Sequence, residues 1–345
     1  MNNYTTFRNH RLGISFLLDK KAILITGLLF VITACVLILS VGIGTLFITP
    51  LDVIKTLAGS GSDQHSLIIN NFRLPRVITA LFVGAFLAAS GTILQSLIRN
   101  PLASPDVIGI TGGASLAAVV FITLFQSASI QWLPFASFTG SMAACLLLYI
   151  LAWKGGVTPL RLVLTGIGVG AGLTAFTTFL ILKSPLHLTS KAMIWMTGSV
   201  YGSDWRNVRT LLVWALVLFP VALVFGRSAN IQQLGDDVAT GVGNHVQKHR
   251  LILLLLSAAL AGCAVAIGGA IGFVALIAPH IARKLVSNSF GQLLPVSALC
   301  GSLMVMLADL IGRTAFSPLD IPVGIFTSAI GAPFFIYLLY KNRNA

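Results

Sequence analysis

The side chains in this sequence that could carry chemistry are few, and most of them are basic. The chain has 345 residues, with nine acidic side chains against 22 Lys and Arg. Two neighbouring acids, Asp236 and Asp237, lie in a polar stretch between apolar segments, and Arg73, Arg76 and Arg313 lie beside other apolar segments. Arginine grips carboxylates through a planar fork of donors. The acidic pair and these arginines are therefore the charged residues whose places in the fold need to be established.

Catalysis, metal binding and nucleotide binding find little support in the residue pattern. No phosphate-binding GxxxxGK[ST] motif occurs, and no cluster of carboxylates or of His and Asp is evident. His245 and His249 are four residues apart, which suits a metal, but a third ligand is not evident. The cysteines lie in apolar runs without CxxC spacing, so they are predicted to be small packing residues at positions 35, 145, 263 and 300. We expect no metal and no cofactor.

The composition places most of the chain in lipid. Hydrophobic residues make up 56% of the sequence and charged residues 9%, whereas a soluble domain is roughly a quarter charged. The net charge of +13 could indicate nucleic-acid binding. However, the basic residues stand singly between apolar runs, which is how a membrane protein sets its orientation. We expect no nucleic-acid partner.

Apolar segments long enough to cross a bilayer as helices recur along the whole chain. The first 21 residues are polar and basic and do not resemble a cleaved signal peptide, so we expect a cytoplasmic tail at 1–21. Ten spans are predicted: 22–47, 74–98, 106–125, 132–152, 161–182, 208–225, 251–269, 271–287, 293–312 and 323–340.

The distribution of basic residues favours ten spans over nine. Residues 251–287 could form one long helix and a loop, or two helices joined at Gly268 and Gly269. With ten spans and a cytoplasmic N-terminus, 14 of the 22 basic residues lie inside, whereas nine spans leave 11 on each side. The positive-inside rule therefore selects ten. We predict one transmembrane domain over 1–345, an all-α polytopic fold with both termini cytoplasmic and a cytoplasmic connection at 226–250.

Two local patterns predict details of the third and fifth spans. Asp106 is the first residue of the third span and is predicted to be its N-cap. The glycines at 166, 168, 170 and 172 predict close helix packing through small residues.

The ionisable residues within the spans help to decide whether transport would be driven by an ion gradient or by ATP. Ion-coupled carriers place ionisable residues near the bilayer midplane, and the only candidate is Asp309, close to the outer end of its helix. If ATP is used, another polypeptide must bind it. The 226–250 connection could receive such a motor through a short helix with Asp236 and Asp237 in its first turn, where the helix dipole favours acids. An ordinary solvated loop helix is the alternative.

Several motifs, in order, resemble the permease subunits of type II ATP-binding-cassette importers, the family of the vitamin B12 and iron–siderophore permeases. The resemblance runs from about residue 45 to residue 340. It rests on RLPR (73–76), NPLASP (100–105), WMTGS (195–199), LGDDVA (234–239), GAIGF (269–273), PHIAR (279–283), ADL (308–310), IPVG (321–324) and GAPF (331–334). Each motif is weak alone, and their order on a ten-span frame makes the resemblance specific.

The resemblance implies a vitamin B12 permease-like fold with ten helices per subunit and three kinds of partner. These are a second permease subunit, cytoplasmic ATPase subunits and an extracytoplasmic substrate-binding protein. It implies that the loop after the sixth span couples to the ATPase, which here comprises Leu234, Gly235, Asp236, Asp237, Val238, Ala239 and Gly243.

The resemblance also implies that Arg73, Arg76 and Arg313 dock the binding protein. Alternatively, Arg73 and Arg76 anchor a helix end at the lipid headgroups. Arg313 lies four residues after Asp309, so the two can pair on one helical face.

The expected function is an importer permease in the cytoplasmic membrane that translocates an iron–siderophore complex and hydrolyses no ATP itself. Haem and cobalamin are alternative substrates, and an ion-coupled secondary transporter is an alternative mechanism. A membrane enzyme is disfavoured because no catalytic cluster is evident. The second permease subunit is either a sister permease or a second copy of this chain.

Overall fold

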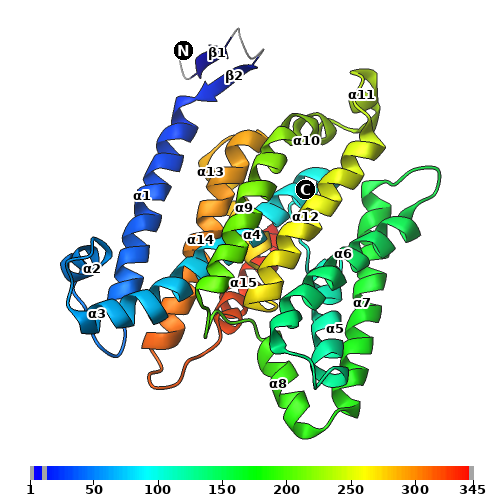
Figure 1. The fold of residues 1–345 in the computed structure, drawn as a ribbon. Coiled ribbons are helices and arrows are strands. Elements are labelled where there is room, and N and C mark those ends of the chain that lie inside the picture. Colours follow the sequence, from blue (N-terminus) through cyan, green and yellow to red (C-terminus); the bar gives the residue numbers. More distant parts are fainter. Residues whose placement is uncertain (1–3, 10–13, 342–345) are drawn as a thin grey trace.

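Helices make up most of the protein that the computed structural model describes, which is residues 4–9 and 14–341 (Figure 1). In this part of the chain the strands are β1 (Tyr4–Asn9) and β2 (Ile14–Asp19), which pair antiparallel. This hairpin precedes the first long helix. The predicted all-α membrane fold is confirmed for the rest of the described residues.

The helices follow one another with short connections. In chain order they are α1 (Lys20–Gly42), α2 (Pro50–Leu57), α3 (Asp63–Ile68), a π-helical turn (Ile69–Arg73), α4 (Leu74–Ile98), α5 (Ile110–Leu124), a 3-10 turn (Ile130–Trp132), α6 (Leu133–Ala152), α7 (Pro159–Lys183), α8 (Leu186–Met196), α9 (Trp205–Val224), α10 (Gly226–Gln233), α11 (Asp236–Gly241), α12 (Val246–Gly268), α13 (Val274–Leu285), α14 (Phe290–Thr314) and α15 (Val323–Lys341).

Each of the ten predicted spans overlaps one α-helix of the structure. Among the described residues, eight helices are long and apolar enough to cross a membrane on their own. The two exceptions are α5, with 15 residues, and α13, with 12. The predicted count of ten is therefore approximate: ten helices occupy the predicted spans in the described residues, and two of them, α5 and α13, are shorter than a full span.

The short helices start late because the backbone before each one leaves helical geometry. Gly109, Gly269 and Phe273 all have positive φ angles, of 78°, 69° and 66°. Non-helical backbone at membrane depth is tolerated where protein covers it. Gly109 is the N-cap of α5 and no side chain caps that helix, so the prediction that Asp106 caps the third span was wrong. Asp106 instead lines a cavity of about 320 Å³ between α5 and α7.

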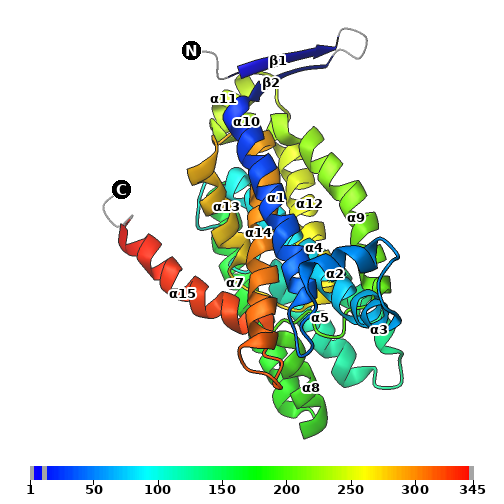
Figure 2. The ribbon, with the colours of Figure 1, turned by 90° about the vertical axis from the view of Figure 1, so that its left-hand side faces the viewer.

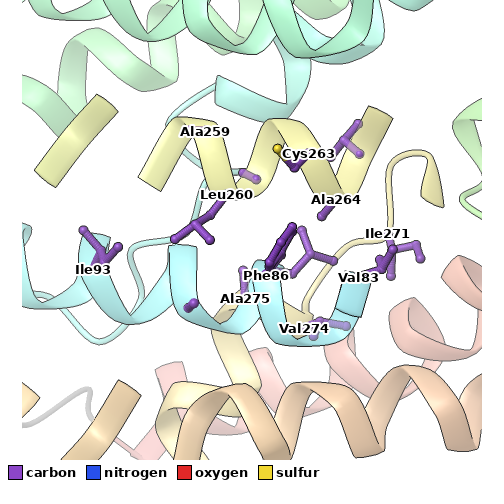
Figure 3. Packing of buried hydrophobic residues seen from close by; sticks show 14 of the residues in the cluster. Val83, Phe86, Ile93, Ala259, Leu260, Cys263, Ala264, Ile271, Val274 and Ala275 are labelled. Atoms are coloured by element: carbon purple, nitrogen blue, oxygen red, sulfur yellow. The ribbon is translucent and has the colours of Figure 1, made fainter. Parts of the chain in front are cut away.

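Helix α4 forms the centre of the molecule. It packs against α14 on one side and α12 on the other, and also against α13 and α9. Figure 3 shows Phe86 and Val83 of α4 facing Cys263 and Ala264 of α12. In the most apolar stretch of each helix, 83% of residues are buried in the α4 segment and 78% in α12, against 17% in α7. Protein therefore surrounds α4 and α12, whereas α7 lies at the periphery.

Glycines let the central helices approach closely. A Cβ atom on Gly84 of α4 would overlap the backbone carbonyl of Gly301 in α14. The predicted packing role of the glycine run in α7 holds for Gly166, where a Cβ would overlap the loop before α5. Gly168 and Gly172 have no heavy atom within 4 Å of an added Cβ. The surface of α7 around Gly168 and Gly172 is therefore formed by small residues that no other described part of the chain covers.

Connections of different kinds gather at the two ends of the helix bundle. The β1–β2 hairpin, α10 and α11 lie at one end, and α2, α3 and α8 lie at the opposite end (Figures 1 and 2). The predicted coupling loop and the predicted docking arginines thus belong to opposite ends.

Candidate functional site

The short helix predicted in the 226–250 connection is present. It is α11, six residues long, and it begins at Asp236 directly after Gly235. Gly235 has a φ of 112° and Gly243, beyond the helix end, has a φ of 78°. Both are in the region of backbone space that favours glycine. The bracketing glycines thus turn the chain into and out of α11.

The outer surface around α11 is apolar. Leu234, Val238 and Val242 are exposed by 67%, 50% and 64%. Ala239 faces inward and is fully buried. A cavity of about 810 Å³ lies beside these residues, between the α11 region, the end of α4 and the start of α7. Exposed aliphatic side chains next to a recess, on a polar connection, are typical of a surface that another protein covers.

The two acids of α11 have different environments. Asp237 is exposed. Asp236 forms an ion pair with Arg250 of α12, with 2.7 Å between Oδ1 and Nη2, and a longer one of 3.4 Å with Arg99. Arg250 is fully buried, and its other terminal nitrogen donates to the carbonyl oxygen of Val157. Asp236 is therefore bonded to the protein interior.

At the opposite end, Arg73 binds the C-terminal end of α1. Its Nη1 donates to the carbonyl oxygens of Val41 and Gly42 at 3.0 and 2.9 Å, and its Nη2 donates to that of Leu46 at 2.6 Å. The residue is 9% exposed. A helix C-terminus carries partial negative charge, so the guanidinium satisfies otherwise unpaired carbonyls.

Arg76 holds two carboxylates together. It forms ion pairs with Asp309 at 2.8 Å and with Asp320 at 2.7 Å, and the bond to Asp320 is bidentate. Its guanidinium carbon also lies 5.4 Å from the centre of the Tyr201 ring. The side chain of Arg76 is 13% exposed and that of Asp320 is 29% exposed. Asp320 therefore covers the solvent side of this arginine.

Arg313 joins the same cluster from α14. Its Nε lies 3.5 Å from Oδ2 of Asp309, which confirms the pairing predicted from their spacing of four. Its terminal nitrogens donate to the carbonyl oxygens of Ile43 and Ser40. All three arginines predicted to dock a binding protein thus have partners within the chain. Their docking role stays a prediction.

The main site residues that the sequence did not reveal are Asp320 and Arg250. Asp320 lies 244 residues from Arg76, and only folding brings the two together. Arg250 precedes an apolar run, and its position in the sequence indicates only a positive charge on the cytoplasmic side of a span. No spacing pattern links it to Asp236, because the chain reverses direction between them.

The histidine pair does not form a metal centre in the structure. His249 Nδ1 contacts Oδ1 of Asn244, and the rings of His245 and His249 lie 6.5 Å apart. Over the described residues, no three His, Cys, Asp or Glu side chains come together as a candidate metal site.

The pattern of helices and motifs matches a known family over most of the chain. The FecCD transport family matches residues 30–341. This chain belongs to the FecCD transport family. Its members are permeases, and the apolar helices described above make this chain a multi-pass membrane protein.

Curated relatives of this FecCD chain are similar along nearly their full length. It is 51% identical to "Probable siderophore transport system permease protein YfhA" of Bacillus subtilis (strain 168), covering 95% of this chain and 97% of the relative. It is 50% identical to the achromobactin transport system permease protein CbrC of Dickeya dadantii (strain 3937), covering 92% and 91%. It is 42% identical to the iron(3+)-hydroxamate import permease FhuG of Bacillus subtilis (strain 168), covering 93% and 96%.

A solved structure has the same fold. It is described as an inward-facing conformation of a metal-chelate type ABC transporter, and it shares 30% identity and a TM-score of 0.81 with this chain. The match covers 93% of this FecCD chain and 99% of the solved one. The vitamin B12 permease-like architecture predicted from the motifs is confirmed.

Proposed function

We propose that this chain is the membrane-spanning permease subunit of an ATP-binding-cassette importer that moves an iron–siderophore complex across the cytoplasmic membrane. The observation that carries the proposal is the match of the FecCD family to residues 30–341, together with the fold shared with an ABC transporter. In this function the chain provides the path through the bilayer and hydrolyses no ATP itself.

The proposed substrate class rests on the relatives. Their names specify siderophore, achromobactin, ferric hydroxamate, ferric citrate and ferric enterobactin. These ligands differ in chemistry but share a chelated ferric ion. A ferric chelate is therefore favoured over haem or cobalamin.

The proposed contact with the ATPase is the α11 region, comprising Leu234, Gly235, Asp236, Asp237, Val238, Ala239 and Gly243. Three observations support it: the exposed aliphatic side chains, the adjoining cavity and the position at the same end as the basic N-terminal segment. This end faces the cytoplasm under the positive-inside rule, with both chain termini on that side.

The opposite end is the proposed docking face for an extracytoplasmic binding protein. Arg73 and Arg313 bind carbonyl oxygens at the end of α1, so they stabilise the backbone that forms this face and are not themselves placed to contact the partner. Arg76 is the arginine best placed to meet a partner carboxylate, because Asp320, which binds it from the solvent side, is itself 29% exposed. Docking through Arg76 would exchange an internal carboxylate for an external one.

A second permease subunit, a sister permease or another copy of this chain, is proposed to cover α7. The small, uncovered face at Gly168 and Gly172 supports this placement. Small residues allow close approach between helices of different subunits in lipid.

Uptake by a deletion strain tests the proposal. Loss of the gene should abolish uptake of at least one radiolabelled ferric siderophore, and the plasmid-borne chain should restore it. The purified chain should retain an ATPase subunit through washing. Uptake that stops when a protonophore is added but continues after ATP depletion would instead support an ion-coupled carrier. If the deletion strain takes up all ferric chelates normally but loses uptake of haem or cobalamin, the substrate would be reassigned.

A further inference from the structure

The ion pair of Asp236 belongs to a chain of contacts that runs from α11 to α7. Its first link is the 2.7 Å pair with Arg250. Arg250 is 0% exposed, and Asp236 is the only carboxylate with which it forms an ion pair among the described residues. A buried cation depends strongly on its partner, because unpaired charge is costly away from water. The position of α11 is therefore tied to α12.

The second link joins α12 to the loop before α7. Both polar backbone atoms of Val157 are bound from α12: its N–H donates to Oε1 of Gln247 at 2.9 Å, and its carbonyl oxygen accepts from Nε2 of Gln247 at 3.2 Å and from Arg250. Val157 is fully buried. The first turns of α12 thus clamp this loop residue at both of its hydrogen-bonding groups.

The third link joins the loop to α7 itself. Arg161, in the first turn of α7, donates to the carbonyl oxygens of Lys154 and Gly156, each at 3.0 Å. Thr158 caps the same helix by accepting from the N–H of Arg161. The loop and the start of α7 therefore form one hydrogen-bonded unit.

The helix at the end of this chain of contacts is held loosely by the rest of the protein. In its most apolar stretch, α7 has 17% of its residues buried, against 78% in α12. Within this chain α7 packs mainly against α5 and α6 and leaves most of its surface uncovered, whereas α12 is buried in the core. A force on α11 that shifts the Asp236–Arg250 pair and the Val157 loop thus meets least resistance at α7.

We propose that Asp236 is a positioning residue that transmits movement of α11 to α7 through Arg250 and Val157. This proposal deepens the proposed function, on which it rests. It separates two roles within the α11 region. The exposed Leu234 and Val238 supply contact area for the ATPase, while Asp236, whose side chain is 31% exposed, binds the buried Arg250 and links that contact to α12 and α7. The weaker pair of Asp236 with Arg99 adds a connection to the end of α4.

The test uses the whole transporter, with its ATPase and binding protein, reconstituted in vesicles. Asp236→Asn removes the charge and keeps the size of the side chain. We expect the variant to retain its ATPase subunits and to hydrolyse ATP, while ferric chelate taken up per ATP hydrolysed falls at least about tenfold. Asp236→Glu keeps a carboxylate and should restore part of the ratio. The control is Lys248→Gln, an exposed cation in the same turn as Arg250, which should leave the ratio unchanged.

A distance measurement distinguishes transmission from a general loss of stability. Spin labels at Leu160→Cys, at the start of α7, and Ser287→Cys, in the α13–α14 connection, are both at exposed positions. The exposed native Cys35 is replaced by Ala in all samples. Binding of a non-hydrolysable ATP analogue should change the distance between the two labels in the parent protein and leave it unchanged with Asp236→Asn.

The outcomes are separable. A normal uptake ratio or a normal distance change in Asp236→Asn would overturn the proposal, and so would loss of the ATPase subunits, because that would make Asp236 a docking residue.

If Asp236→Asn does not accumulate, the variant Arg250→Lys decides. Lysine keeps the charge but lacks the planar fork that reaches both Asp236 and Val157, so we expect the same uncoupling of uptake from ATP hydrolysis. Normal coupling in this variant would reject the link. Absence of an ATPase from the parent complex would refute the proposed function instead.

Discussion

Arg73, Arg76 and Arg313 show how a charged side chain can serve the fold at a place where sequence suggests recognition. The Nη atoms of Arg73 make three hydrogen bonds to carbonyl oxygens at the end of α1. Arg313 donates to two further carbonyls of that segment and pairs with Asp309. Asp309, the one ionisable residue noticed in the spans, is 1% exposed and carries two arginine partners. It therefore serves the arginine cluster, and a role as a coupling-ion site is not needed to explain it.

Replacing Arg73 should lower stability. Arg73→Gln removes a guanidinium whose hydrogen bonds each join a charged donor to a helix-end carbonyl, and bonds of this type contribute about 1.5–3 kcal/mol each. We expect a lower Tm for the detergent-purified protein. Lys55→Gln, at an exposed position in α2, is the control and should leave the Tm unchanged. An unaltered Tm for Arg73→Gln would mean that water satisfies these carbonyls equally well.

Weakening the bond between Arg76 and Asp320, its partner on the solvent side, should strengthen docking of the binding protein. Asp320→Asn weakens a bidentate ion pair and frees the outer edge of Arg76 for a carboxylate of the partner. The affinity of the iron-loaded binding protein should rise about threefold to tenfold, as measured by surface plasmon resonance on the solubilised transporter. Asp63→Asn, an exposed acid at the same end, controls for the change in net charge. Weaker binding by Asp320→Asn would show that Asp320 belongs to the docking surface itself.

The helices differ in how completely protein surrounds them, and this difference assigns their roles. Helices α4, α12 and α14 are mostly buried, whereas α1, α7, α9 and α15 are mostly exposed. Exposed faces of a membrane helix meet either lipid or another subunit. Both α1 and α7 expose large apolar side chains, which suit lipid or a partner helix. Helix α7 differs in having two uncovered glycines, Gly168 and Gly172, where the backbone of a helix from another subunit could approach closely.

Two glycine substitutions should separate a packed helix from an open one. Gly84→Ala places a methyl group against the backbone of Gly301, and overpacking of this kind costs about 1–3 kcal/mol. Gly168→Ala meets no atom within 4 Å and gains helix propensity. In thermal unfolding of the isolated chain, we expect the first variant to be destabilised and the second to be equal to the parent or more stable. Equal stability of both variants would show that α4 and α14 can separate without penalty.

On the scale of the whole molecule, the two ends of the bundle face different compartments in the proposed transporter. The α11 end carries the proposed motor contact, and the end with α2, α3 and α8 carries the arginine cluster (Figure 2). A transporter driven from one side and loaded from the other requires this separation, because the two partners occupy opposite sides of the membrane.

Labelling in intact cells tests that orientation. In a Cys35→Ala background, Ser60→Cys lies in the exposed α2–α3 connection and Thr240→Cys lies in the exposed part of α11. A membrane-impermeant maleimide should label position 60 in whole cells and position 240 only after permeabilisation. The reverse pattern would invert the topology and remove both the motor contact and the docking face.

The sequence by itself determined the membrane class, the approximate positions of the helices in the ten predicted spans, the short glycine-bracketed helix after the sixth span and the family. These features depend on local composition, periodicity and motif order, all of which are visible in the amino-acid sequence without the fold. It did not determine that α5 and α13 are shorter than a full span, because their late starts depend on loops with positive φ at Gly109 and Phe273 that the surrounding protein covers. Only the tertiary structure showed that Asp236 faces Arg250 and that Arg76 is bound to Asp309 and Asp320. The partners are between 14 and 244 residues apart in the sequence, with no helical or strand spacing to link them. A charge therefore reveals its partner only when folding places the two within a few ångströms.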